Sequence, residues 1–412
     1  MPVDFLRIPP RSDVPNVSQP SILAWALLLC LMLAGSTAVA VVIRPAGKPD
    51  SLLFWFCAVG LPILAWSFLL SCRFAYMYGC VNAVLATNRT SDAIETQCHE
   101  SSSQPLAVLG HAWRFSSSDG ENGIDALIEG KTKLRPVSSQ AAPNTDVIAR
   151  WLDVPGRRFY AGNALTEHAR QAAVCEWLLN QLVHDLVRQF AGLPAGVSMN
   201  VDLCIDSVLD AETVGKRVLS LLQDTFRTSR IDINPPKSAL SLFHMDSWFD
   251  DMRSDEIKLL VAVQLRKATS EVLIDGVAEA GSMLLVSAPS VARKMGELSP
   301  LCIHRPATDM AEQVADTLKL AIRWGRASFD NIGAIWRTGL AGETARIIHS
   351  SCHFASGMET VDLDTTIGKA GVASAWLATT LATANAALTN EPQLITVQEG
   401  DETLALVCEK QI

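Results

Sequence analysis

The chain begins with two long, uncharged apolar runs, Ser21 to Ile43 and Ser51 to Cys72. Each run has more than about 20 residues, and at a rise of about 1.5 Å per residue such a helix crosses a hydrocarbon core of roughly 30 Å. The link 44–50 contains two prolines and one glycine and is too short for anything but a tight reversal. The sequence therefore predicts a transmembrane helical hairpin over 21–73, behind a tail over 1–20, with both flanks on the same side of the membrane.

A cleaved secretory signal is the alternative for the first run. Ala38-Val39-Ala40 resembles the small-residue cleavage site of such a signal. However, some twenty residues precede the run, and it is longer than the roughly 7–15 apolar residues of a signal core. We therefore favour the hairpin.

The orientation of the hairpin follows from a small excess of basic residues on its flanks. The flanking residues are Arg7, Arg11, Arg73 and Arg89, and those in the link are Arg44 and Lys48. Because cytoplasmic segments carry the Lys/Arg excess, we expect both ends on the cytoplasmic side of the membrane.

Cysteine usage favours the same compartment. Six of the cysteines beyond the hairpin are scattered without framework spacing: Cys98, Cys175, Cys204, Cys302, Cys352 and Cys408. Unpaired thiols at apolar positions are typical of a reducing compartment. The neighbours Cys302-Ile-His304 and Cys352-His353 lack the two-pair spacing of a zinc site, so we expect no metal.

Net charge and composition limit what the part after the hairpin can do. A formal net charge of −9 without a basic stripe argues against nucleic acid as a partner. We expect a connecting segment over 74–146, rich in Ser, Gly, Gln and Pro from His99 onward and containing a first strand at Leu106 to Trp113. A domain with its own core follows over 147–412. No internal repeat of fixed period is visible.

Hydrophobic periodicity over 147–412 alternates between helical and strand spacing, which is typical of a layered α/β domain. The first part predicts a helix over 172–190, a half-buried strand over 199–205, a helix over 214–226, a strand covered on both faces at 259–263 and another strand at 283–286. The last third predicts a strand at 302–304, a helix over 309–324 capped by Thr308, a central Ala-rich helix over 367–388, and a closing hairpin of strands at 394–397 and 403–407.

The segment Asp362 to Trp376, with Gly368-Lys369-Ala370-Gly371 at its centre and two closing strands behind it, resembles the C-terminal half of thiolase-like condensing enzymes. The resemblance extends over most of Pro105 to Ile412 and implies a layered thiolase-like α/β fold. The family has a Gly-His-x-x-Gly-Ala helix here, and Lys369 stands where its catalytic histidine would be.

The departures from that family concern its chemistry. A condensing reaction needs a thiolate and two imidazoles. Cys175 lies in mid-helix on a face that should be buried, and no cysteine precedes a run of small residues at a helix start. The resemblance therefore implies a degenerate domain without assigned catalytic residues or cofactors. Cys352, His353 and Lys369 are the remaining candidates for reactive groups.

Other constellations point to ordinary structural roles. Gly368-Lys369 is not a phosphate loop, since Leu363 stands where that motif needs glycine and Ala370 where it needs Ser or Thr. His244, Asp246, Asp250 and Asp251 surround Trp248, and we interpret them as a capped surface turn rather than an acid/base or metal site.

The layout of a short tail, a hairpin and a degenerate thiolase-like domain also resembles uncharacterised membrane proteins encoded beside bacterial type VI secretion genes. Two hypotheses follow. The first is a non-enzymatic, membrane-anchored adaptor that binds a protein partner of a secretion apparatus or an effector. The second is a membrane-tethered enzyme that handles acyl or thioester substrates. A convergent Cys/His/His pocket would favour the enzyme, and a packed interior with an exposed apolar patch would favour the adaptor.

Overall fold

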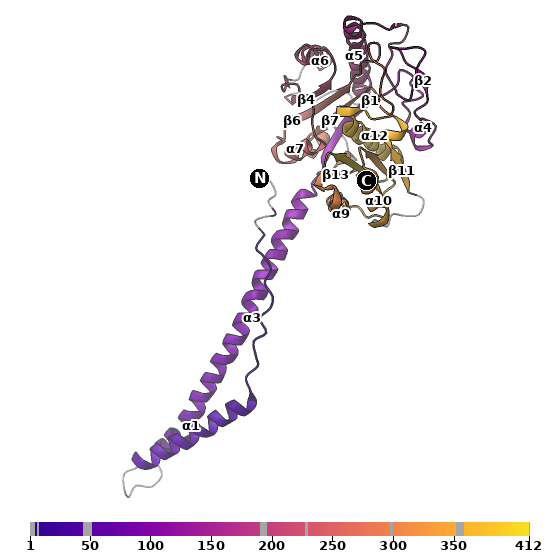
Figure 1. Ribbon diagram of the computed structural model, residues 1–412. Helices are drawn as coiled ribbons and strands as arrows, with labels where there is room; N and C mark the ends of the chain where they lie inside the picture. Colours follow the sequence, from indigo (N-terminus) through magenta and orange to yellow (C-terminus); the bar gives the residue numbers. More distant parts are fainter. Residues whose placement is uncertain are drawn as a thin grey trace. The chain divides into compact units, whose positions relative to one another are not determined.

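The computed structural model describes Phe5 and residues 8–43, 52–189, 196–226, 230–296, 300–351 and 358–411 (Figure 1). It contains two compact units, one over Val3–His99 and one over Glu100–Ile412. The division falls about 26 residues after the hairpin end predicted from the sequence at residue 73, because a helix continues through that point.

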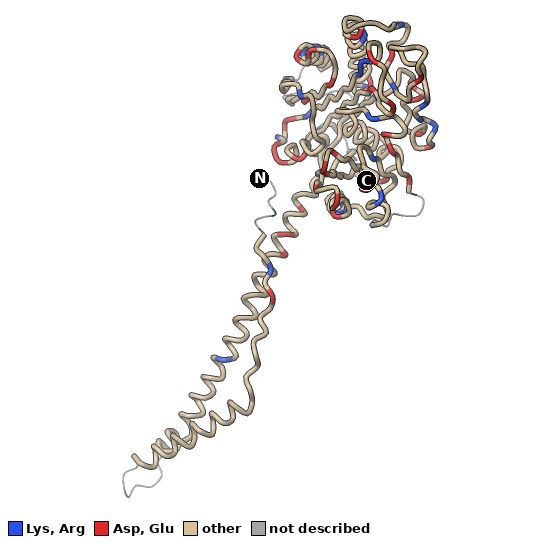
Figure 2. The backbone as a smooth tube through the Cα atoms, in the orientation of Figure 1, with Lys and Arg blue, Asp and Glu red and all other residues tan. Residues whose placement is uncertain are grey.

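The N-terminal unit is a helical hairpin. It consists of α1 (Ile22–Ile43), α2 (Leu52–Trp55), a π-helical turn (Phe56–Gly60) and α3 (Leu61–Ser102). Two helical stretches, Ile22–Ile43 and Leu52–Ser102, are long and apolar enough to cross a membrane. No residue of α1 is buried, and Figure 2 shows no charged residue in α1 or in the first turns of α3. A core helix of a soluble protein would bury these side chains, so this apolar surface needs another cover, such as lipid.

Side-chain hydrogen bonds connect α1 with the second helical stretch of the hairpin. Ser36 Oγ donates a hydrogen bond to the Ala58 carbonyl at 2.7 Å, within the π-helical turn. Trp66 Nε1 donates to the Trp25 carbonyl at 2.8 Å. A π turn displaces backbone carbonyls from the regular helical pattern, and the Ser36 hydroxyl provides a partner for one of them.

The N-terminal tail runs back along α3. Arg11 pairs with Asp92 and Glu95, and the Ser12 backbone exchanges two hydrogen bonds with the Asn88 side chain. The tail and the last turns of α3 therefore lie on the same side of the hairpin, as predicted. The helix α3 continues beyond the apolar run, because a change from apolar to polar residues does not by itself end a helix. The first proline after the run is Pro105, beyond the last turn.

The second unit contains a mixed sheet built from two halves. The strands of the first half are β1 (Leu106–Arg114), β4 (Ser198–Asp206), β5 (Arg230–Ile233), β6 (Glu256–Gln264) and β7 (Ala280–Ser287). Those of the second half are β8 (Leu301–Ile303), β9 (Ala307–Met310), β10 (Ala334–Thr338), β11 (Glu359–Asp362), β12 (Gln393–Glu399) and β13 (Glu402–Lys410). Antiparallel pairing of β1 with β8 joins the halves.

The two halves repeat one topology. Apart from β9, which pairs with β13 outside this path, the order is β5-β4-β6-β7-β1 in the first half and β11-β10-β12-β13-β8 in the second, so that these five strands follow the chain order 3-2-4-5-1 in both. In each half the fifth strand, β7 or β13, is antiparallel to its neighbours. The sequence shows no repeat of fixed period because the two halves share connectivity and not residues.

Helices cover both outer faces and fill the space between the halves. The long helices are α5 (Ala164–Val187), α6 (Ala211–Thr225), α9 (Val314–Trp324), α10 (Gly342–Ser351) and α12 (Ser374–Thr389). Figure 1 shows α5 and α6 at one end of this unit, α9 and α10 at the other, and α12 between them. α12 contacts β1 and β7 of the first half and β10 and β12 of the second. Its buried alanines allow this close packing, which confirms the prediction of a central Ala-rich helix.

The shorter elements complete the unit. They are α4 (Ile124–Ile128), β2 (Val137–Ser138), β3 (Asp146–Val147), a 3₁₀ turn (Leu242–Met245), α7 (Asp246–Asp251), α8 (Pro289–Lys294), a 3₁₀ turn (Ala311–Gln313), α11 (Leu363–Thr366) and a 3₁₀ turn (Gly371–Ala373). Together with the sheet and helices they form a layered α/β domain behind two long apolar helices, and the predicted fold class is confirmed.

Three local predictions are wrong. The strand β4 is covered on both faces, because Asp202 is buried and accepts a hydrogen bond from Asn234 Nδ2 at 2.8 Å. Residues 307–310 form β9 rather than a capped helix start, and the helix begins at Val314. The central helix begins at Ser374 and not at 367, because Gly368 and Gly371 adopt positive φ angles of 109° and 51° that interrupt a right-handed helix.

Candidate functional site

A cavity of about 540 Å³ lies where strands of both halves end. Its lining includes the last residues of four strands, Asp206, Gln264, Thr338 and Glu399, together with the segment that leads into α12. We call it the carboxyl-edge cavity. In α/β sheets this edge is the usual place for a ligand, because loops rather than strands shape it.

Lys369 lines this cavity. Its backbone N–H donates to the Gly276 carbonyl at 2.7 Å, and its carbonyl accepts from the Ala278 N–H at 3.0 Å. Gly368, directly before it, has little space for a side chain, since a Cβ would meet Ala278 Cβ at 3.0 Å. The Lys369 side chain is exposed, and no described residue forms an ion pair with it. The backbone is therefore fixed on both sides while the ammonium group is solvated.

The loop before α12 is locked to the end of β6. Gln264 Oε1 accepts from the Val372 N–H at 3.0 Å, and Gln264 Nε2 donates to Asp206 Oδ2 at 2.8 Å. Gly371 makes this possible, because a Cβ there would lie 2.0 Å from Gln264 Oε1. Gln264 thus bridges the two halves at the floor of the cavity.

Two acidic residues of the lining, Asp364 and Glu399, accept hydrogen bonds that hold the surrounding chain in place. Asp364 accepts from Thr338 Oγ1 at 2.7 Å and from the Gly339 N–H at 3.0 Å. Glu399 Oε1 accepts from the Leu242 N–H at 3.0 Å. Each carboxylate holds a strand end or loop in place, so this arrangement assigns neither of them as a catalytic base.

Arg266 is a second cation of the lining, and a buried ion-pair network positions its backbone. Arg170 Nη2 lies 2.7 Å from Glu279 Oε2, and both side chains are fully buried. Glu279 Oε1 accepts from the Arg266 N–H at 2.6 Å. The Arg266 Nε atom is itself buried and has no hydrogen-bond partner in the structure. The cavity therefore presents two cations, Lys369 and Arg266, without carboxylate partners among the described residues.

The interior next to the cavity is filled by aromatic rings. Trp248 of α7 stacks on Trp376 of α12 with ring centroids 6.0 Å apart. Trp376 Nε1 donates to the carbonyl of Leu240, which lines the cavity. The space between α7 and α12 is thus packed.

The described cysteines of this unit are far from nucleophilic. Burial raises the pKa of Cys204 to about 11 and those of Cys175, Cys302 and Cys408 to about 12. These thiols therefore stay protonated near neutral pH. The described lining of the carboxyl-edge cavity contains no cysteine and no histidine. Of the three candidate reactive groups, Lys369 lies at the cavity, and Cys352 and His353 lie outside the described residues.

The His244 cluster is a capped turn, as predicted, but it lies at the surface only in part. Trp248 at its centre is fully buried, and Asp246 and Asp250 pair with Arg305 of the second half at 3.0 and 2.6 Å. The pKa of Asp246 is raised. Desolvation is the main cause and repulsion from Asp250 adds to it, while the positive charge of Arg305 lowers the pKa by less. The cluster joins the halves. Over the described ranges, no group of three or more His, Cys, Asp or Glu side chains is placed to hold a metal ion.

The sequence did not predict that Gln264 and Arg266 line the cavity, that Arg305 pairs with the His244 cluster, or that Trp376 stacks on Trp248. Gln264 and Arg266 follow the buried run Leu259 to Val263, and polar residues at the end of a covered strand are the one signal that could have found them. Arg305 and Trp376 carry no such signal, since their partners lie more than 50 residues away along the chain.

Comparison with known proteins gives similarity in fold only. No protein-family profile and no curated protein sequence matches the chain. Among solved structures, the ishigamide ketosynthase/chain length factor matches at 12% identity and a TM-score of 0.46, covering 75% of this chain and 100% of that one. The oxazolomycin ketosynthase domain of Streptomyces albus matches at 12% identity and a TM-score of 0.49, covering 75% and 74%.

Cerulenin-bound OleA of Xanthomonas campestris matches at 8% identity and a TM-score of 0.45, covering 74% of this chain and 97% of that one. Ketosynthases are condensing enzymes, the class that the sequence resemblance and the enzyme hypothesis named. At these identities the likeness concerns the course of the backbone and not the chemistry. What the chain has in common with these structures is a layered α/β fold.

Proposed function

We propose that the chain is a membrane-anchored adaptor whose α/β domain binds a partner protein at the bilayer. One observation carries this proposal. The Trp248–Trp376 pair fills the space between α7 and the central helix α12, and the carboxyl-edge cavity beside it offers neither thiol nor imidazole in its described lining. A packed interior serves the stability of a binding domain, whereas condensation chemistry needs a nucleophile and proton carriers.

The hairpin gives such an adaptor its location. Both apolar stretches expose their side chains, and anchoring the domain raises its effective concentration toward a membrane-bound partner without any new contact. The resemblance to proteins encoded beside type VI secretion genes favours a component of a secretion apparatus or an effector as the partner. The bacterial inner membrane, with the domain in the cytoplasm, is the corresponding location.

A second candidate function is an enzyme that handles acyl or thioester substrates at the membrane. Lys369 favours it, because this unpaired amine lines a cavity at the carboxyl ends of the strands, where Ser241 also lies. The Ser241 hydroxyl, however, accepts from the Phe243 N–H at 3.1 Å, and the structure shows no hydrogen bond between it and a described imidazole.

Lys369→Ala separates the two functions. The adaptor predicts that partner recovery from detergent extracts and activity in cells stay within a few-fold of the parent, as with Lys294→Ala on the exposed face of α8. Loss of activity in the Lys369 variant, with expression and thermal unfolding unchanged and the control intact, would instead establish the enzyme.

Replacing the hairpin tests the adaptor directly. The three core clusters lie almost entirely between Leu106 and Cys408, so a fragment from Glu100 onward should fold. We expect it to function poorly in cells and to regain most activity when an unrelated two-helix anchor is fused to it. Full activity of the untethered fragment would contradict the proposal.

A further inference from the structure

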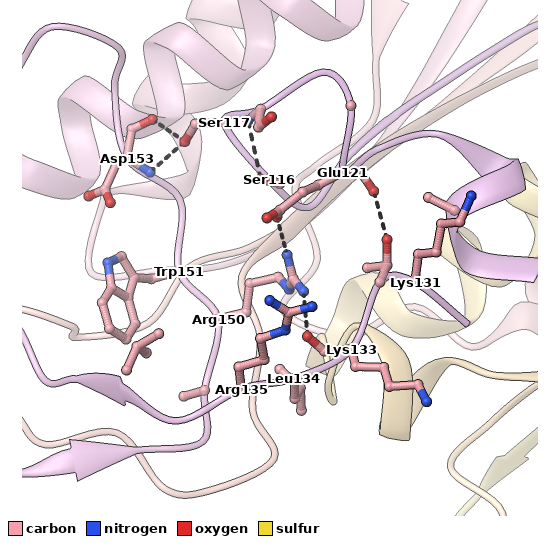
Figure 3. Close-up of a pocket in the computed structure, with 16 residues that line it drawn as sticks. Ser116, Ser117, Glu121, Lys131, Lys133, Leu134, Arg135, Arg150, Trp151 and Asp153 are labelled. Atoms are coloured by element: carbon pink, nitrogen blue, oxygen red, sulfur yellow. Dashed lines mark hydrogen bonds and ion pairs between the residues drawn. The ribbon is translucent and has the colours of Figure 1, made fainter. Parts of the chain in front are cut away.

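A second cavity, of about 630 Å³, lies in the loop-rich segment between β1 and α5 (Figure 3). We call it the loop cavity. Its lining includes four cations, Lys131, Lys133, Arg135 and Arg150, and the aromatic ring of Trp151. None of these residues belongs to the carboxyl-edge cavity. No function was predicted for this Ser/Gly-rich segment.

The frame of the loop cavity is rigid although it has little regular structure. The Asn122 amide is satisfied on both sides: Oδ1 accepts from the N–H groups of Phe115 and Ser116, and Nδ2 donates to the carbonyls of Ser116 and Ser118. The Asn122 carbonyl accepts from Trp113 Nε1 at 2.9 Å. This network fixes the serine loop and so preorganises one wall of the cavity.

Arg150 is fixed as the innermost cation. Its backbone pairs with the segment before β7, donating to the Val277 carbonyl and accepting from the Glu279 N–H. Its guanidinium lies over the Phe115 ring at 5.5 Å and pairs with Glu121 at 2.7 Å. The side chain is only 13% exposed, and its Nε is buried without a hydrogen-bond partner. Nη2 also donates to the Lys133 carbonyl at 3.4 Å, so only the remaining Nη hydrogens of this guanidinium are available to an anion.

The remaining charges of the lining do not balance. Glu121 neutralises Arg150, and Lys131 pairs with Glu129 outside the cavity. The pKa of Glu121 is lowered: its burial acts to raise it, but a hydrogen bond with Ser116 and the charges of Arg150 and Arg135 outweigh that effect. Lys133 and Arg135 have no carboxylate partner among the described residues, and Asp153 points away from them in Figure 3.

We infer that the loop cavity binds a small phosphate-bearing anion, with the phosphoryl group at the guanidinium groups of Arg135 and Arg150, with Lys133 adding positive charge nearby and with the rest of the molecule against Trp151. Two uncompensated cations match the roughly two charges of a phosphate monoester at neutral pH. The planar guanidinium fork fits phosphate oxygens in a bidentate manner. This site is independent of the proposed adaptor role.

The test uses the full chain in neutral detergent and measures binding by calorimetry at constant ionic strength. The probes are inorganic phosphate, glycerol 3-phosphate and dihexanoyl phosphatidic acid. Binding of the first two points to a soluble ligand, and binding of the lipid analogue alone points to a membrane headgroup. Either result supports a phosphate site.

The double variant Arg135→Gln/Lys133→Gln should bind at least about tenfold more weakly, since it loses a charge-assisted contact and a nearby positive charge. Both side chains are exposed, so the fold should persist, which thermal unfolding checks. The matched control Arg158→Gln/Lys294→Gln removes an exposed arginine and lysine outside the cavity and should bind like the parent. If no probe binds the parent, or if the double variant binds as tightly as the parent, the inference is wrong.

Discussion

Trp248 and Trp376 stack on each other with ring centroids 6.0 Å apart and an interplanar angle of 24°, and both are fully buried. One comes from α7 in the first half and the other from α12 in the second, so their contact joins the halves at the centre of the domain. Their indole N–H groups differ. Trp376 Nε1 donates to the Leu240 carbonyl at 3.0 Å, whereas Trp248 Nε1 is buried without a partner.

This difference predicts unequal effects of two similar substitutions. Trp376→Phe leaves the Leu240 carbonyl without its donor and should lower the free energy of unfolding by about 1–3 kcal/mol more than Trp248→Phe, which removes an unpaired buried donor. Denaturant unfolding followed by far-ultraviolet circular dichroism measures both. Equal losses, or a larger loss for Trp248→Phe, would contradict the assignment of the hydrogen bond.

Gly371→Ala should destabilise the loop before α12. A Cβ there would lie 2.0 Å from Gln264 Oε1 at a φ of 51°, so the Gln264–Val372 hydrogen bond must break. The matched control is Gly400→Ala, which has a φ of 64° but open space. The control should cost about 1–2 kcal/mol from the backbone alone, and Gly371→Ala about 1–3 kcal/mol more. Thermal unfolding of the two variants side by side decides the point.

His111 should make the domain sensitive to mild acid. Burial lowers the pKa of its imidazole to about 4, and Nδ1 is buried without a partner. As the pH falls from the unfolded pKa of about 6.5 toward 4, His111 binds a proton in the unfolded chain but not in the folded chain. The free energy of unfolding therefore falls by up to about 3 kcal/mol. His111→Gln should lack this part of the acid sensitivity. Parallel pH profiles for parent and variant would refute the effect.

Topology is testable with a fused reporter. The tail and the last turns of α3 lie on the same side of the hairpin, and the basic residues favour the cytoplasm. A reporter that is active only in the periplasm should therefore stay silent when fused after Ile412, while the same reporter placed in the link 44–50 should be active. The reverse pattern would put the domain outside the cytoplasm.

Local patterns predicted most of the elements and little of the site. The apolar stripe with Leu179 and Leu182 marked α5, and the alternation around Gly400 marked the closing hairpin. Both signals are local, because burial of one face imposes a period on the sequence. The start of α12 was missed because Gly368 and Gly371 hold positive φ angles that only contacts with Ala278 and Gln264 explain.

The sequence by itself determined the long apolar hairpin and the layered α/β class, because both follow from the spacing of apolar residues along the chain. Only the tertiary structure decided that Trp248 is a core residue and that Lys369 lies at a cavity. It also decided that Arg150 pairs with Glu121 at the loop cavity. These relationships join residues that are distant in the sequence. Their positions depend on how the two halves pack, and no local period records that packing.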